Sequence, residues 1–153
     1  MDYGELISLI NKEQGDRVEF GDLNSEYVPS KERIDETEKI LKIQLPPSYL
    51  WFLSQYGGGE IYGDILTGIN PQFREEDVDD IAAASFADRK DGLIRNSDLL
   101  LLSTSYGESY LFDTTMKDDD GEFAVVRLFG GERKVVAQNF IEFLIRFIRD
   151  GEF

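Results

Sequence analysis

The sequence contains no cysteine and no histidine among its 153 residues. Cysteine supplies thiolate nucleophiles and zinc ligands, and histidine is the commonest metal ligand and the usual proton carrier near neutral pH. Their absence excludes Cys/His zinc sites, histidine-ligated haem, Ser-His-Asp triads and Cys-His dyads. An enzyme would have to rely on carboxylates, Lys, Tyr, Ser and Thr, so the sequence favours a protein without catalytic activity.

Positive charge is also scarce. Lys and Arg number 16 against 31 Asp and Glu, which gives a formal net charge of −15. A protein of this charge repels nucleic acid and anionic lipid and attracts cationic molecules. We therefore expect no nucleic-acid ligand, and we expect that any macromolecular partner is basic.

No run of apolar residues is long enough to cross a bilayer, so no membrane association is expected. Residues 1–5 lack a basic leader with an apolar segment, and glycine is not the second residue, as N-myristoylation requires. The default expectation is a cytoplasmic protein. Apolar residues make up 41% of the chain and aromatic residues 12%, enough to form the core of one domain over residues 1–153.

Hydrophobic periodicity of the helical kind occurs at both ends of the chain. Ser30 and Asn139 occupy positions typical of N-caps, and Pro47 suits the first turn of a helix. Gly57 and Gly151 stand where helices commonly end. The predicted helices cover residues 5–10, 31–42, 47–56, 75–89 and 140–150.

The middle of the chain is rich in strand signals. Residues 61–69 contain few helix formers and two glycines, which predicts a bent hairpin or a bulged strand. Four short apolar segments follow at residues 99–102, 110–112, 123–128 and 135–136, separated by turn-forming residues. This arrangement predicts an α+β fold in which helices pack on a mainly antiparallel central sheet.

Two glycine-containing segments resemble catalytic or nucleotide-binding loops but fail on their context. Gly57 to Gly59 follow a helix, whereas a phosphate-binding loop follows a strand and opens a helix. They are predicted to stop the helix. The segment from Gly107 to Leu111 approximates a nucleophile elbow, but Leu111 replaces the required glycine and no histidine is present as a base, so it is interpreted as the entry to a strand.

The first candidate functional cluster is acidic and lies between residues 75 and 80. Such a cluster could ligate a metal, imitate phosphate groups for a basic partner, or cap and solvate the start of a helix. The sequence leaves these three interpretations open. Its acidic members are Glu75, Glu76, Asp77, Asp79 and Asp80.

The second acidic cluster comprises Asp118, Asp119 and Asp120, followed by Gly121. It resembles the middle of a calcium-binding loop. In that alignment, however, Met116 and Arg127 fall at the first and last ligand positions, where carboxylates are required. We expect a solvated hairpin turn, with at most weak calcium binding.

The single tryptophan, Trp51, lies off the apolar stripe of its predicted helix. An exposed tryptophan would suit an anchor at a protein interface, whereas packing against another layer is the commoner outcome. Both interpretations stay open.

The segment from Ser30 to Gly59 carries a pattern beyond that of a helix pair. It reads Ile34-x-x-Thr37-Glu38-x-x-Leu41, then Ile43-x-Leu45-Pro46-x-Ser48-Tyr49-x-x-Phe52-Leu53-x-x-Tyr56-Gly57-Gly58. This pattern resembles the Smi/Knr-like family of the SUKH superfamily, with Tyr56 in place of the usual Asn. Weaker similarity in the later strands and the last helix extends the resemblance over about residues 30–148. Residues 1–29 add an N-terminal helix and an extension.

The resemblance implies an α+β fold without catalytic activity, cofactor or metal. Many bacterial members are immunity proteins that neutralise a cognate toxin, frequently a nuclease, and fungal relatives are regulatory interaction proteins in cell-wall synthesis. The leading hypothesis is therefore an immunity or antitoxin protein that binds a basic toxin domain. The residues expected to contact that partner are Glu75, Glu76, Asp77, Asp79, Asp80, Asp118, Asp119 and Asp120, with Trp51 as an apolar anchor.

Two other functions compete with this hypothesis. One is a regulatory interaction module with a host protein partner, which the fungal relatives suggest. The other is a metal-dependent hydrolase that uses carboxylates alone, which would need convergent acids that the sequence does not locate.

Overall fold

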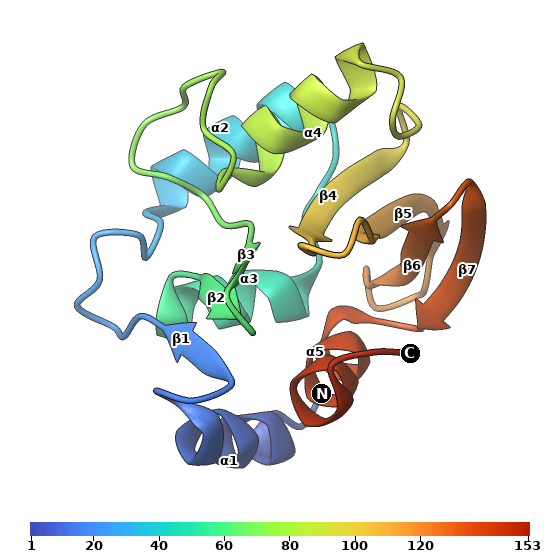
Figure 1. The fold of residues 1–153 in the computed structure, drawn as a ribbon. Coiled ribbons are helices and arrows are strands. Elements are labelled where there is room, and N and C mark those ends of the chain that lie inside the picture. Colours follow the sequence, from blue (N-terminus) through green and yellow to red (C-terminus); the bar gives the residue numbers. More distant parts are fainter.

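The computed structural model describes residues 1–153 and contains five helices and a seven-stranded sheet (Figure 1). The helices are α1 Gly4–Glu13, α2 Lys31–Leu41, α3 Pro47–Tyr56, α4 Ile81–Lys90 and α5 Phe140–Asp150. The strands are β1 Val18–Phe20, β2 Gly59–Ile61, β3 Asp64–Leu66, β4 Asp98–Ser103, β5 Ser109–Lys117, β6 Phe123–Phe129 and β7 Glu132–Ala137.

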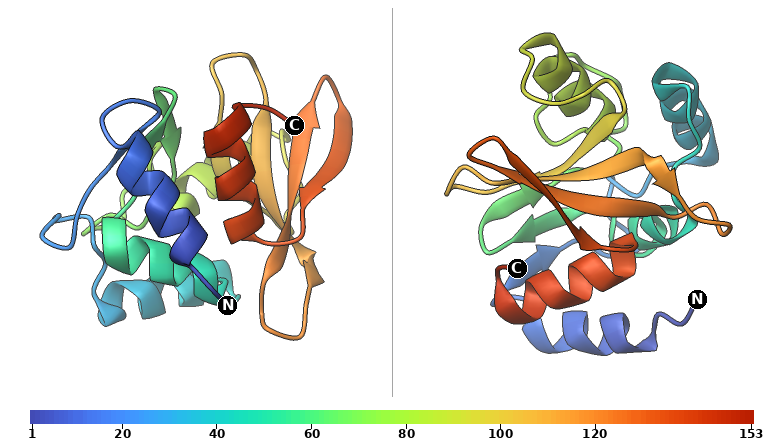
Figure 2. Two further views of the ribbon diagram at one scale, coloured as in Figure 1. Left: turned by 90° about the horizontal axis from the view of Figure 1, so that it is seen from below. Right: turned by 90° about the vertical axis from the view of Figure 1, so that its right-hand side faces the viewer.

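The strands lie in chain order, and every neighbouring pair is antiparallel. Helices α1, α3 and α5 cover one face of the sheet, and α2 and α4 lie on the other (Figure 2). The main core is a cluster of 30 buried residues, in which Tyr49, Phe112 and Phe140 meet in edge-to-face contacts. A smaller cluster of Ala84, Ile94, Leu100 and Leu111 lies beneath α4. The predicted α+β fold with a mainly antiparallel sheet is confirmed.

The capping residues predicted for three helices are confirmed. The Ser30 side chain accepts a hydrogen bond from the Arg33 N–H at the start of α2, and Asn139 accepts one from the Glu142 N–H at the start of α5. Gly57 ends α3 in the left-handed region, with φ of 72°. None of the helices is long and apolar enough to span a membrane.

The helix predicted over residues 75–89 begins six residues late, at Ile81. Asp80 is its N-cap and accepts hydrogen bonds from the Ala82 and Ala83 N–H groups. The Gly68 N–H donates to the Asp79 carbonyl, and the Ile81 N–H donates to the Gly68 carbonyl. This bridge fixes the backbone of Asp80 in an extended conformation directly before the helix, while residues 75–79 form turns. Aspartates favour caps and turns over helix interiors.

The strand-rich region is largely as predicted, with two differences. Residues 59–66 form a hairpin whose turn, Tyr62-Gly63, has φ of 52° and 82°. The meander from β4 to β7 is confirmed. Strand β1 was not predicted, because three residues are too few to show an alternating pattern. It is held by pairing with β2 and by hydrogen bonds between the Gln14 side chain and the Phe20 backbone.

Candidate functional site

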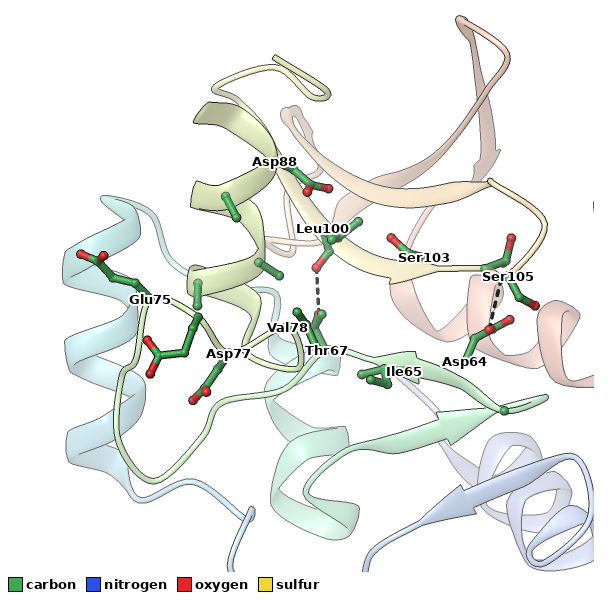
Figure 3. A pocket seen from close by; sticks show the side chains of 16 residues that line it. Asp64, Ile65, Thr67, Glu75, Asp77, Val78, Asp88, Leu100, Ser103 and Ser105 are labelled. Atoms are coloured by element: carbon green, nitrogen blue, oxygen red, sulfur yellow. Dashed lines mark hydrogen bonds between the residues drawn. The ribbon is translucent and has the colours of Figure 1, made fainter. Parts of the chain in front are cut away.

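A cleft of ≈ 550 Å³ opens between the β2–β3 hairpin, α4 and the end of β4 (Figure 3). Strands β3 and β4 share a single paired position, Leu66 with Leu102. The outer end is closed by the Ser105 N–H, which donates to Asp64 Oδ1 over 3.2 Å. The α4 residues that line the cleft include Ala83, Ala84 and Ala87. Because alanine side chains are short, the space between helix and hairpin stays open.

The rim of this cleft is strongly acidic. Five carboxylates line it, and no Lys or Arg does. They come from the hairpin, from the loop before α4 and from α4 itself, so they surround an apolar centre that includes Ile65, Val78 and Leu100 (Figure 3). The five are Asp64, Glu75, Glu76, Asp77 and Asp88. We call this feature, with its lining residues, the acidic cleft.

The loop that carries Glu75, Glu76 and Asp77 is held by hydrogen bonds to Asn70, which is itself bonded to Arg33. The Asn70 side-chain amide donates to Asp77 Oδ2 (3.2 Å) and to Asp79 Oδ1 (2.7 Å). Arg33 Nε on α2 donates to the Asn70 carbonyl over 2.9 Å. These bonds fix the loop, and they leave the exposed side chains of Glu75 and Glu76 free of any protein partner.

Asp88 lies on α4 and is half-buried. Partial burial, followed by repulsion from Asp91, raises the pKa of Asp88 above its ordinary value. Both effects penalise the ionised form. A cation placed in the cleft would relieve this penalty, and so would protonation.

Asp88→Asn is therefore expected to raise stability slightly at pH 7, by less than about 0.5 kcal/mol. An acid whose pKa is raised on folding contributes stability only as it becomes protonated, so the advantage of the variant should shrink as the pH falls through the folded pKa. Urea unfolding between pH 7 and pH 4 measures the difference. The exposed Asp119→Asn serves as the control, and an advantage that grows on acidification would contradict the assignment.

A sequence model of the family described as SUKH_6, SMI1-KNR4 cell-wall, matches residues 31–144. The matched segment is most of the chain and includes every residue of the acidic cleft. The chain belongs to the SUKH_6 (SMI1-KNR4) family. The resemblance read from the sequence is thereby confirmed, and α1 and β1 of this SUKH_6 protein lie outside the matched segment.

The two acidic clusters that were both expected to contact the partner lie apart in the SUKH_6 fold. Asp118, Asp119 and Asp120 lie in the turn that follows β5 (Figure 2). Residues 103–105 of the acidic cleft lie where β5 begins, at the other end of that strand. Asp118 Oδ1 accepts the N–H groups of Asp120 and Glu122, so the predicted solvated hairpin turn is confirmed. No group of three or more acidic side chains is arranged to hold a metal ion.

Three other predicted contact residues lie outside the acidic cleft and make contacts within the SUKH_6 fold. Asp79 accepts a hydrogen bond from the Asn70 side chain. Asp80 is fully buried as the N-cap of α4, so it presents no surface to a partner. Trp51 is half-buried on α3, where its ring stacks on Tyr3 with centroids 3.9 Å apart and meets Tyr56 edge-on.

Sequence reasoning missed Asp64 and Asp88, which complete the rim of the cleft in this SUKH_6 protein. They come from a hairpin and from a helix, and nothing in the local sequence joins them to residues 75–77. The available signal was indirect. Four alanines between residues 82 and 87 precede Asp88, and a small-residue helix face beside a carboxylate is compatible with a cavity.

Proposed function

We propose that this SUKH_6 protein is a non-catalytic immunity protein of the cytoplasm, which binds and neutralises a cognate basic toxin domain through the acidic cleft. One observation carries the proposal: a cleft lined by five carboxylates and by no basic side chain, in a chain of net charge −15. Such binding requires no histidine, thiol, cofactor or metal.

The physical argument concerns both the rate and the strength of association. A nuclease domain that grips phosphates is basic, and opposite net charges accelerate encounter. Exposed charges are screened beyond about 8 Å at physiological salt, so this acceleration depends on ionic strength. The exposed side chains of Ile65 and Val78 supply apolar surface inside the ring of charge, which is the usual anatomy of a protein interface.

The experiment is co-expression with the product of a neighbouring toxin-like gene, followed by kinetics on the purified complex. Glu75→Gln/Glu76→Gln removes two charges from the cleft, and Asp119→Asn/Asp120→Asn removes two from the β5–β6 turn. At low salt we expect the cleft variant to associate about tenfold more slowly than the wild type, with the difference shrinking as salt is added. The turn variant should keep nearly the wild-type rate.

Three results would count against the proposal. Failure to rescue growth, or failure to form a complex, would remove the immunity function. A larger effect of the turn variant would place the interface at the β5–β6 turn instead. An association rate that does not respond to salt would remove the electrostatic account.

A second function is favoured by the description of the matched family, which refers to the cell wall. In this alternative the acidic cleft binds a host regulatory protein in place of a toxin. Affinity capture from cells that carry no toxin gene distinguishes the two. A stable partner lost with Glu75→Gln/Glu76→Gln supports the regulatory role, and recovery of no such partner counts against it.

A further inference from the structure

A second cavity adjoins the acidic cleft along α4. It has a volume of ≈ 500 Å³ and lies between α2 and α4. Glu75, Ala83 and Ala87 line both cavities. Figure 3 shows Glu75 on the side of α2, while Asp77 and Val78 lie toward the hairpin. The two cavities therefore meet along α4, with Glu75 at their junction.

The walls of the second cavity are apolar and come from three segments. Ile40 projects from α2 and is 37% exposed. Phe73, from the loop, and Phe86, from α4, are half-buried and meet edge-on with ring centroids 6.4 Å apart. The guanidinium of Arg89 lies over the Phe86 ring and so covers part of it. Large side chains that leave such a space between them can receive an apolar side chain from another molecule.

We infer that the two cavities form one docking groove for a segment of a partner protein in which an apolar residue and a Lys or Arg lie close together in the sequence. The apolar side chain occupies the space between Ile40, Phe73 and Phe86. The cationic side chain lies in the acidic cleft, with Glu75 as the first carboxylate that it meets. The inference rests on the proposed function in one respect, since the occupant belongs to a protein partner.

The charges of the groove select this occupant. The cleft half carries five carboxylates, and Lys90 is the one basic residue that lines the apolar half. An anionic lipid, a nucleic acid or an acidic peptide would meet repulsion in the cleft. A second copy of this chain is disfavoured in the same way, because each copy carries a net charge of −15. A purely apolar ligand would leave the acidic half unused.

The test is an NMR titration of the full-length ¹⁵N-labelled protein with capped synthetic peptides. The parent peptide carries a Phe followed by a pair of Arg residues. One matched peptide has Gly in place of the Phe, and the other has Gln in place of both Arg. We expect the parent to shift the amides of Glu75, Ala83 and Ala87 and to bind about tenfold more tightly than either matched peptide.

Two variants assign the apolar half of the groove. Ile40→Ser alters an exposed wall residue and should lower the affinity of the parent peptide to that of the peptide without Phe. Met116→Ser removes a similarly exposed apolar side chain on β5 and should leave the affinity unchanged. Circular dichroism of both variants confirms that the fold is retained.

The inference is overturned if all three peptides bind equally, if none causes shifts at about 1 mM, or if the shifts map to another surface. It is also overturned if Ile40→Ser has no effect. These failures are distinct from failure of the proposed function. A salt-sensitive toxin complex without peptide binding in the groove removes this inference alone, and peptide binding without any toxin complex removes the immunity role alone.

Discussion

Gly59→Ala is expected to destabilise the protein by about 3 kcal/mol or more, enough to leave much of the chain unfolded at 37 °C. A Cβ atom at this position would lie 2.1 Å from the Glu19 carbonyl oxygen and 2.9 Å from the Phe20 Cα. Both are backbone atoms of β1, the strand that pairs with β2 at this point, so neither can move without breaking the sheet. The φ of 146° adds strain for any residue with a side chain.

The matched control is Gly107→Ala. Gly107 has φ of 88°, but no atom lies within 4 Å of its added Cβ, so only the conformational penalty of about 1 kcal/mol applies. Urea unfolding of both variants measures the difference. Equal losses of unfolding free energy in the two variants would show that a Cβ atom at position 59 does not clash with β1. The glycine segment from 57 to 59 thus does more than end α3, since Gly59 allows the backbone of β1 to pack closely against β2.

Arg133→Met is expected to lower the free energy of unfolding by about 3 to 5 kcal/mol, because it leaves buried carboxylates without their cationic partner. The Arg133 guanidinium donates two hydrogen bonds to the Asp98 carboxylate, Nη1 to Oδ2 over 2.8 Å and Nη2 to Oδ1 over 2.9 Å. Its Nη2 also lies 3.4 Å from Asp113 Oδ2. Asp98 is fully buried, and Asp113 is its partner across β4 and β5. Without the guanidinium, two like charges would face each other in a protected environment.

The pH dependence provides a second measurement of the same network. Burial opposes the ionisation of Asp113, but hydrogen bonds from Thr115 and the Arg133 guanidinium outweigh it and lower the pKa of Asp113. A carboxyl with a lowered folded pKa contributes stability above its unfolded pKa and loses it as the pH falls through the folded value. The difference in unfolding free energy between wild type and Arg133→Met should therefore narrow as the pH falls toward the lowered pKa of Asp113.

The control for this network is Arg149→Met, which breaks an exposed pair with Glu5 at 2.6 Å. Exposed pairs contribute about 0.2 to 1 kcal/mol, so this variant should stay close to the wild type. A loss at Arg133 no larger than the loss at Arg149, or a gap that is independent of pH, would contradict the assigned role of the buried network.

The parts of the fold that the sequence predicted correctly are those with local signals. Helices α2 and α3 are specified by the Ser30 cap, the proline at position 47 and the Gly57 stop, all within one segment. The predicted start of α4 was wrong because Gly68, a distant residue, bonds to the backbone of Asp79 and Ile81 and so fixes Asp80 in an extended conformation. Strand β1 was missed because its stability comes from pairing with β2 and from Gln14, and not from its own pattern.

The candidate site likewise contains residues with a local sequence signal and residues that only the fold brings together. Residues 75–77 were predicted because they are adjacent in the chain, and they do line the cleft. Asp64 and Asp88 reach it only through the packing of the hairpin against α4, which no local pattern encodes. The β5–β6 turn looked equivalent in sequence, but it follows β5, whereas residues 103–105 of the cleft lie where that strand begins.

The most direct test of the central claim is hydrogen exchange on the protein alone and on its complex with the co-expressed toxin domain. We predict slower exchange in the complex at the β2–β3 hairpin, at residues 75–80 and along α4, with no change in the β5–β6 turn. Protection confined to that turn or to the surface around Trp51, or the same exchange in both samples, would contradict the claim that the acidic cleft is the binding surface.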